Sequence, residues 1–165
     1  MVSIIILNYH VKEELFDCLH SIIASKPKTK YEVIVVDNDE KKTIKQELLK
    51  TFPKVMYVPN RNRGFGQGNN VGSRHAKGEY LFFLNADTIV FKNTIDVLFE
   101  FLRKNKHAGV VAPFLLHENK KPFALQGVKT LTPFRAIFSI SLINKLFPNN
   151  LIAKDYFIQW DKITT

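Results

Sequence analysis

Continuous apolar runs alternate along the chain with segments in which apolar residues recur every three or four positions. The β-branched runs at 2–7 and 31–38 predict strands buried on both faces, which is typical of parallel sheets. Between them, residues 12–25 place apolar side chains, among them Leu15 and Leu19, at helical spacing behind an acidic first turn. The chain therefore begins with a strand, a helix and a second strand.

The same alternation continues as far as Pro113. Alternating strands and helices predict an α/β fold with a mostly parallel, twisted sheet and helices on both of its faces. The predicted elements are a helix over 41–52, a strand over 54–59, a glycine-rich loop over 60–70, a short helix over 69–78, a strand over 79–88, a helix over 93–105 and a strand over 108–113.

The regular alternation stops after Pro113. Residues 115–127 resemble a hairpin, residues 132–148 predict an apolar helix with scattered basic residues, and residues 155–165 have strand character. No internal repeat, low-complexity tract or linker interrupts the sequence, so we predict a single domain over residues 1–165.

The composition is that of a globular protein, with 45% hydrophobic and 24% charged residues in 165. The formal charge of +9 predicts affinity for anions, which include nucleotides, nucleic acid, acidic lipid headgroups and phosphorylated substrates. The single cysteine, Cys18, cannot form an intrachain disulfide, and its helical position favours a buried, inert thiol in a reducing cytosol. No apolar run reaches the length of a signal peptide or membrane span, so a cytoplasmic protein is expected.

Four polar clusters follow the predicted strands: residues 8–10, 37–39, 61–66 and 85–87. Because ligands of open α/β sheets bind beyond the carboxyl ends of the strands, we expect all four clusters to line one edge. A carboxylate beside a buried strand is costly, so Asp87 requires a compensating role.

Several common sites are excluded by spacing. The glycines of the loop follow the third strand and do not fit G-x-G-x-x-G, and no G-x-x-x-x-G-K-[ST] occurs. The histidines show no metal-ligand spacing, and no Ser-His-Asp or Cys-His arrangement is apparent. A dinucleotide-binding dehydrogenase, a P-loop protein and a triad hydrolase are therefore not favoured.

The segments "VSIIILNYH", "YEVIVVDN", "NRGFGQGNN", "HAKGEYLFFLNADT" and "AGVVAP" follow one another in an order and spacing that resemble the donor half of family 2 glycosyltransferases. The bacterial rhamnosyltransferase-like branch, which makes cell-surface polysaccharide, looks most similar. The resemblance implies the GT-A fold, with a nucleotide-sugar-binding core over 1–113 and the start of an acceptor-side region over 114–165. It implies a transferase that uses a UDP- or dTDP-sugar donor and a saccharide or lipid-linked acceptor.

By position, the resemblance gives Asp37 the contact with the nucleotide base. It also matches Asn85, Ala86 and Asp87 to the element that holds a divalent cation, Mg²⁺ or Mn²⁺, against the donor diphosphate, with Asp87 as the metal ligand. The expected nucleotide-sugar-binding residues are Leu7, Asn8, Tyr9, Asp37, Asn38, Arg63, Gly64, Asn69, Asn85, Ala86 and Asp87.

Physical chemistry supports this expectation independently, because a hard divalent ion can offset the charge that develops on a diphosphate leaving group. Structural alternatives remain open for each cluster. Asp37 can form an Asx turn with its neighbours, Asp87 can terminate a strand, Arg61 and Arg63 can belong to a solvated loop, and the glycines of the loop can serve turn geometry.

The sequence departs from the family after Asp87, where the later acidic residues are isolated and no acidic stretch matches the family's catalytic base. The expectation is that this chain alone transfers little or no sugar. A second hypothesis is a non-catalytic nucleotide-sugar-binding module. Binding to nucleic acid through the charge ranks last because no reading motif is evident. For helix 132–148 the favoured interpretation is a helix that packs in the core, and peripheral contact at the inner face of the plasma membrane is the alternative. Oligomerisation through exposed apolar surface is a further hypothesis.

Overall fold

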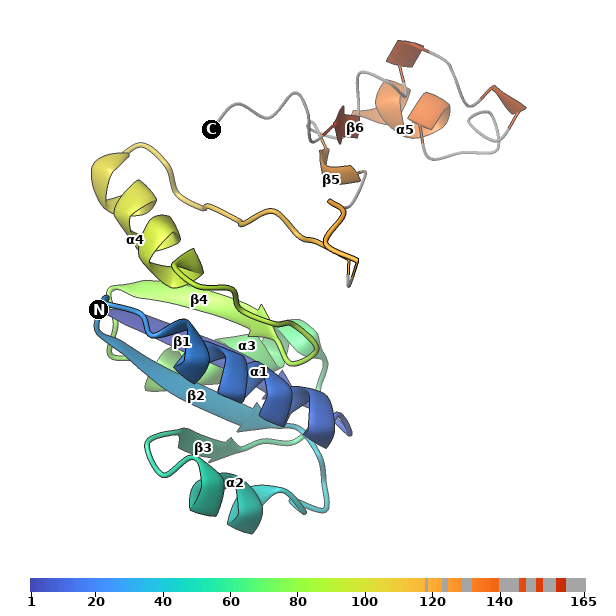
Figure 1. Cartoon of the computed structure of the whole chain (residues 1–165). Helices are drawn as coiled ribbons and strands as arrows, with labels where there is room; N and C mark the ends of the chain where they lie inside the picture. The colour runs from blue at the N-terminus through green and yellow to red at the C-terminus, as the bar shows by residue number, and fades with distance from the viewer. Residues whose placement is uncertain are drawn as a thin grey trace. The chain divides into compact units, whose positions relative to one another are not determined.

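A parallel four-stranded sheet organises the first part of the chain. In the computed structural model its strands are β1 (Val2–Asn8), β2 (Tyr31–Asp37), β3 (Met56–Pro59) and β4 (Tyr80–Asn85), in the order β3-β2-β1-β4. Because every pairing is parallel, the strands all end at the same edge (Figure 1). The structure describes residues 1–117, 119–122, 125–128, 132–139, 146–147, 151–152 and 157–159.

Helices cover both faces of this sheet. They are α1 (Lys12–Ser25), α2 (Lys45–Thr51), α3 (Phe65–His75) and α4 (Thr94–Lys104). Side chains of α1, α2 and α4 share one apolar cluster with one face of the sheet, whereas α3 packs against the other face (Figure 1). The predicted α/β architecture is confirmed, and the helix predicted over 12–25 has those bounds.

The two faces of the central strand explain its continuous apolar run. Ile4 and Ile6 belong to the cluster beneath α1, whereas Ile5 belongs to the cluster beneath α3, and all three are fully buried. Alternate side chains of a strand point to opposite faces, so a strand covered on both sides needs apolar residues at every position.

The glycine-rich segment is more helical than expected. Helix α3 begins at Phe65, so residues 65–68, predicted as loop, form its first turn. Gly64 has a φ of 94°, which confirms the expected turn geometry at that residue. Gly72 serves close packing instead, since a Cβ built there would lie 2.4 Å from Ile5 Cγ2. Tertiary contact with the sheet therefore outweighs the low helix propensity of glycine.

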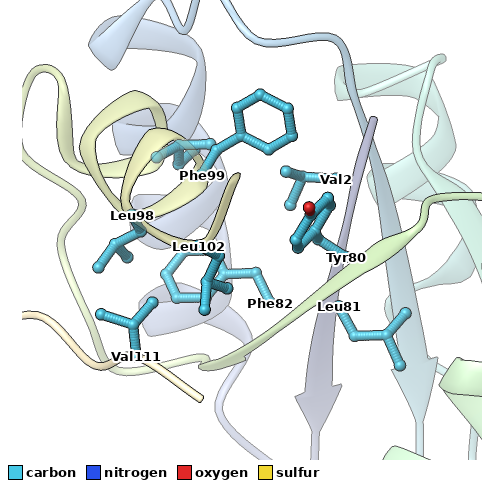
Figure 2. Close-up of a pocket in the computed structure, with 9 residues that line it drawn as sticks. Val2, Tyr80, Leu81, Phe82, Leu98, Phe99, Leu102 and Val111 are labelled. Atoms are coloured by element: carbon cyan, nitrogen blue, oxygen red, sulfur yellow. The ribbon is translucent and has the colours of Figure 1, made fainter. Parts of the chain in front are cut away.

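The strand predicted over 108–113 is wrong. Residues after α4 form a turn in which Ala108 donates its N–H to Asn105 O at 2.9 Å, and the following residues pair with no strand. Val110 is 87% exposed. Val111 instead uses its side chain to line a small apolar pocket of about 50 Å³ between β4 and α4 (Figure 2). Apolar composition alone cannot supply the ladder partner that a strand requires.

Strand β4 is an edge of the sheet. Its side chains Leu81 and Phe83 are 42% and 49% exposed. They point to the same face of the sheet as Ile5 of β1, which α3 covers, but α3 does not cover them. A strand edge with apolar side chains is a surface that other chains can pair with. Oligomerisation nevertheless stays a prediction.

The chain divides into two compact units, Met1–Val111 and Ala112–Thr165, and the second is described here by itself. It contains an antiparallel pair, β5 (Leu125–Val128) and β6 (Phe157–Gln159), and helix α5 (Pro133–Ser139). The single-domain interpretation, with its core over 1–113, stays a prediction.

The elements predicted for this unit are found in part. A bridge between Leu116 and Pro122 lies in the first half of the hairpin expected over 115–127. The end of that segment belongs to β5, which pairs with β6 instead, so the hairpin is not formed as predicted. Helix α5 begins the helix expected over 132–148, and β6 lies within the segment expected to have strand character. The remaining parts of these segments include residues outside the described ranges. Among the described residues, no helix combines the length and apolarity needed to cross a membrane.

Replacing Gly72 by alanine tests the close contact between α3 and β1. The added methyl would overlap Ile5, so we expect Gly72→Ala to lower the free energy of unfolding by about 1–3 kcal/mol. Gly66→Ala, in the same helix with open space around the new Cβ, is the matched control and should raise it by roughly 0.5–1 kcal/mol. Urea denaturation measures both changes, and losses of equal size in the two variants would contradict the packing argument.

Candidate functional site

A cavity of about 500 Å³ opens at the carboxyl edge of the sheet. Its walls come from the end of β1, the residue after β2, the loop before α3 and the end of β4, which confirms that strand-end clusters gather at one edge. The lining residues are Leu7, Tyr9, Val11, Asn38, Asn62, Gly64, Phe65, Leu84, Asn85, Ala86 and Asp87.

Seven of the expected binding residues line this cavity, and four do not. Asn8 and Asp37 are buried, with exposed fractions of 1% and 0%. Arg63 is exposed in the loop, and Asn69 lies on α3, but neither lines the cavity. A contact between Arg63 and phosphate, or between Asn69 and a ligand, stays a prediction.

Asp37 is held in a buried hydrogen-bond network. Its Oδ1 accepts from Asn8 Nδ2 at 2.8 Å and from the backbone N–H of Asp39 at 3.1 Å, while Oδ2 accepts from the Tyr57 hydroxyl at 2.7 Å. Burial and the hydrogen bond to Asp37 both raise the pKa of Tyr57, which keeps its hydroxyl protonated as a donor. Asp37 therefore joins the ends of β1 and β3 to β2 through hydrogen bonds. Its contact with a nucleotide base stays a prediction.

Asn8 shows the cost of this arrangement. Its Nδ2 donates to Asp37, but its buried Oδ1 has no hydrogen-bond partner among the residues that the structure describes. An unsatisfied buried acceptor costs about 1–3 kcal/mol, so the network is built at the expense of local stability.

Asn38 forms the polar part of the cavity wall next to Asp37. Its Oδ1 accepts from Asn60 Nδ2 at 2.7 Å, and the same Nδ2 donates to Gln67 Oε1 at 3.0 Å. Lys42 Nζ donates to the backbone carbonyls of Asp37 and Asn60, which joins the ends of β2 and β3. The residue spacing gave no signal for these supporting contacts, because they join residues from separate parts of the chain.

Two exposed aromatic rings line the cavity. Tyr9 is 50% exposed and Phe65 is 63% exposed. The Tyr9 ring is tilted against His10, with 4.3 Å between the ring centroids, and His10 Nδ1 lies 3.2 Å from Asp39 Oδ2. Exposed aromatic faces of this kind can stack on a planar ligand ring. Phe65 lies in the cluster 61–66 that was expected at this edge, but it was not among the expected binding residues.

Asp87 is presented by a tight turn at the end of β4. The Thr88 hydroxyl donates to Asn85 O at 2.5 Å, and the N–H of Val90 donates to Ser21 Oγ of α1 at 2.9 Å. Asn85 and Asp87 are both exposed at the cavity. The turn therefore places an amide and a carboxylate where a ligand can reach them.

Cys18 lies behind this turn. It is fully buried, as expected, with Sγ 3.8 Å from Asn85 O. Burial raises the pKa of the Cys18 thiol to about 11, and the charge of Asp87 acts in the same direction. A thiol with this pKa is protonated at neutral pH, which confirms a packing role rather than a nucleophilic one.

The chemistry of the exposed turn suits a shared metal site. Asn85 and Asp87 offer oxygen ligands, the type that Mg²⁺ prefers. No cluster of three or more His, Cys, Asp or Glu side chains suited to holding a metal occurs in the described part of the chain. The residues present therefore fit an ion that takes most of its ligands from water and from phosphate groups.

Comparison with known proteins assigns the chain to a family. The family model described as "Glycosyl transferase family 2" matches residues 3–155. An uncharacterized glycosyltransferase of Haemophilus influenzae is 27% identical over the whole chain, which covers 57% of that relative. An uncharacterized glycosyltransferase of Bacillus subtilis, YfnE, is 31% identical over 56% of this chain and 24% of its own length.

Solved structures agree with this assignment. TarS of S. aureus is 26% identical with a TM-score of 0.55, and the match covers 64% of this chain and 20% of TarS. The mannosyltransferase PcManGT from Pyrobaculum calidifontis, solved with GDP-Man and Mn²⁺, is 26% identical with a TM-score of 0.55, covering 61% and 32%. The fold is the GT-A fold of glycosyltransferases.

The chain belongs to glycosyl transferase family 2. It spans less than two thirds of the length of the relatives just described. The expected family and fold are thus confirmed, and the rhamnosyltransferase-like branch stays a prediction.

The Tyr57 hydroxyl tests the buried network. Tyr57→Phe removes a hydrogen bond to the Asp37 carboxylate, so we expect the free energy of unfolding to fall by about 1.5–3 kcal/mol. Tyr31→Phe is the matched control, because no residue in the described ranges bonds to that hydroxyl, and its effect should stay within about 0.5 kcal/mol. Similar small changes in both variants, measured by urea denaturation, would argue against the network.

Proposed function

We propose that the protein binds a nucleoside diphosphate sugar in the cavity at the carboxyl edge of the sheet and serves its transfer to an acceptor. The observation that carries this proposal is the convergence of Tyr9, Asn38 and Asp87, from three strand ends, on one cavity of about 500 Å³. A volume of this order is suited to a small molecule of nucleotide-sugar size. Membership of family 2 supports the same reading.

The nucleotide base is assigned to the wall made by the ends of β1 and β2. Tyr9 and Phe65 offer aromatic faces for a planar base, and Asn38 offers a polar contact. Asp37 supports this wall through Asn8 and Asp39 because its own oxygens are fully buried. TarS has been solved with UDP-GlcNAc and PcManGT with GDP-Man, which supports a sugar nucleotide as ligand. We favour UDP or dTDP for this chain.

The diphosphate is assigned to the turn at the end of β4. Asp87 would ligate Mg²⁺ or Mn²⁺ together with the phosphates, and Asn85 would add a neutral oxygen ligand or a hydrogen bond to a ribose hydroxyl. The bound ion supplies positive charge that offsets the charge on the departing diphosphate. With one protein carboxylate at the turn, metal affinity should be weak until the nucleotide is present.

Transfer requires a base that deprotonates the acceptor hydroxyl. Asp87 is the only carboxylate among the described residues that line the cavity, and it is assigned to the metal. We therefore propose that the residues described here bind the donor and that the chain alone transfers little or no sugar. The intact enzyme would act with inversion on a saccharide or lipid-linked acceptor of cell-surface polysaccharide. The alternative function is a binding module that retains nucleotide affinity without catalysis.

The site of action would be the cytoplasmic side of the plasma membrane. The net charge of +9 favours anionic partners, including nucleotides and acidic headgroups. Peripheral contact with the membrane would bring the donor site to a lipid-linked acceptor. Nucleic acid remains the least favoured partner.

Calorimetric titration tests donor binding. We expect UDP or dTDP to bind the purified chain in the presence of Mn²⁺, and we expect removal of the metal with a chelator to weaken this binding at least tenfold. Asp87→Asn should remove most of the metal dependence, because it replaces the assigned metal-binding carboxylate of the cavity lining by a neutral amide.

Asp17→Asn is the matched control for charge. Asp17 is exposed on α1 and does not line the cavity, so this variant should retain both affinity and metal dependence. Folding of each variant is checked by its thermal unfolding curve. Failure of both nucleotides to bind in any metal condition, with the fold intact, would overturn the proposed function.

A further inference from the structure

The amide of Asn38 can face a ligand with either its oxygen or its nitrogen, and the choice changes what the cavity recognises. Asn38 is 3% exposed and forms part of the cavity wall. Its Oδ1 is already engaged, since it accepts a hydrogen bond from Asn60 Nδ2 at 2.7 Å. No residue in the described ranges accepts a hydrogen bond from Asn38 Nδ2, so this end of the amide is left for a ligand.

Asn60 is fixed independently of Asn38. Its backbone N–H donates to Asp37 O at 2.9 Å, and its carbonyl accepts from Lys42 Nζ. Its side-chain Nδ2 carries two hydrogens, and both have acceptors, Asn38 Oδ1 and Gln67 Oε1. The first turn of α3 thus holds Asn60, through Gln67, in the orientation that presents a donor to Asn38.

Gly68 provides the space that this arrangement needs. A Cβ built on Gly68 would lie 3.1 Å from Asn38 Nδ2 and 2.5 Å from Leu7 Cδ2. The helix that supplies Gln67 therefore also allows the Asn38 amide to lie close to its backbone. Helix α3 thus contacts both side chains: Gln67 accepts from Asn60, and Gly68 leaves space for Asn38.

We propose that Asn60 is a positioning residue that turns the Asn38 amide so that Nδ2 donates to the exocyclic oxygen of a keto nucleobase, giving the site a preference for uracil over cytosine. This inference rests on the proposed function, because it concerns the base of the same nucleotide. The two bases share the oxygen at ring position 2, but at position 4 uracil carries an oxygen and cytosine an amino group. The proposed contact is with position 4, where an amide nitrogen can donate only to the oxygen of uracil. The reversed arrangement, with Asn60 Oδ1 accepting from Asn38 and Gln67, would favour cytosine.

Asn60→Asp reverses the polarity without altering a residue that contacts the ligand. A carboxylate can only accept, so Asn38 must turn its nitrogen toward residue 60 and its oxygen toward the cavity. We measure the dissociation constants of UDP and CDP with Mn²⁺ by calorimetry. Wild type should bind UDP more tightly than CDP. In Asn60→Asp this preference for UDP should fall by roughly tenfold or more, because a change of that size corresponds to the free energy of one hydrogen bond lost or gained.

Gln67→Glu is the matched control. It adds the same negative charge to the same network, but residue 67 remains an acceptor for Asn60, so the Asn38 amide keeps its orientation. The added charge should weaken the binding of UDP and of CDP equally. The ratio of the two dissociation constants should therefore stay within about twofold of wild type. Asn38→Asp, which places an acceptor in the wall directly, should reproduce the altered ratio of Asn60→Asp.

The outcomes separate this inference from the proposed function. If wild type binds none of UDP, dTDP and CDP, the proposed function fails. If wild type binds UDP but Asn60→Asp leaves the ratio unchanged while its thermal unfolding shows an intact fold, Asn60 does not position Asn38 and the inference is overturned. A wild-type preference for CDP would overturn the assigned orientation, and an equal change of ratio in Gln67→Glu would mean that charge, rather than amide orientation, sets the selectivity.

Discussion

The burial of the Asp37 carboxylate is the constraint on which the edge of the sheet depends. A charged group that is fully removed from water is costly unless hydrogen bonds replace its hydration. Asn8 from β1, Tyr57 from β3 and the backbone after β2 supply those bonds, so three strand ends must stay in register for the carboxylate to be satisfied. The same register fixes where Asn38 projects. The buried charge therefore organises the wall of the cavity.

The close approach of α3 is the second constraint, and it explains where prediction from sequence failed. Alternating apolar and helical patterns were enough to predict β1, α1 and the parallel sheet, because those patterns follow directly from burial on one or two faces. The glycines of the segment 64–72 favoured a loop because their helix propensity is low. Gly68 and Gly72 instead leave space for packing against Leu7 and Ile5, and that depends on residues distant in the chain.

The candidate site was predictable in outline for a related reason. Parallel strands that end at one edge bring their following residues together, so Tyr9, Asn38 and Asp87 could be grouped from sequence alone. The burial of Asp37 and the support from Asn60 could not, because they depend on which side chain turns inward at each strand end. The contact between Asn60 and Asn38 joins residues 22 positions apart with no periodic signal. The strand expected over 108–113 failed because apolar composition does not reveal whether a ladder partner exists.

The cavity separates two kinds of recognition by charge. Asn38, after β2, is a neutral amide held by other amides, whereas Asp87, after β4, is an exposed carboxylate, and β1 lies between these two strands. Contacts of the first kind depend on geometry and are little affected by salt, whereas interactions of Asp87 with a cation and phosphates are screened as ionic strength rises. In a nucleoside diphosphate, the base would then determine which ligand is chosen, and the diphosphate would determine how strongly metal and salt affect binding. A protein with a net charge of +9 can thus attract anions broadly while discriminating among them at an uncharged surface.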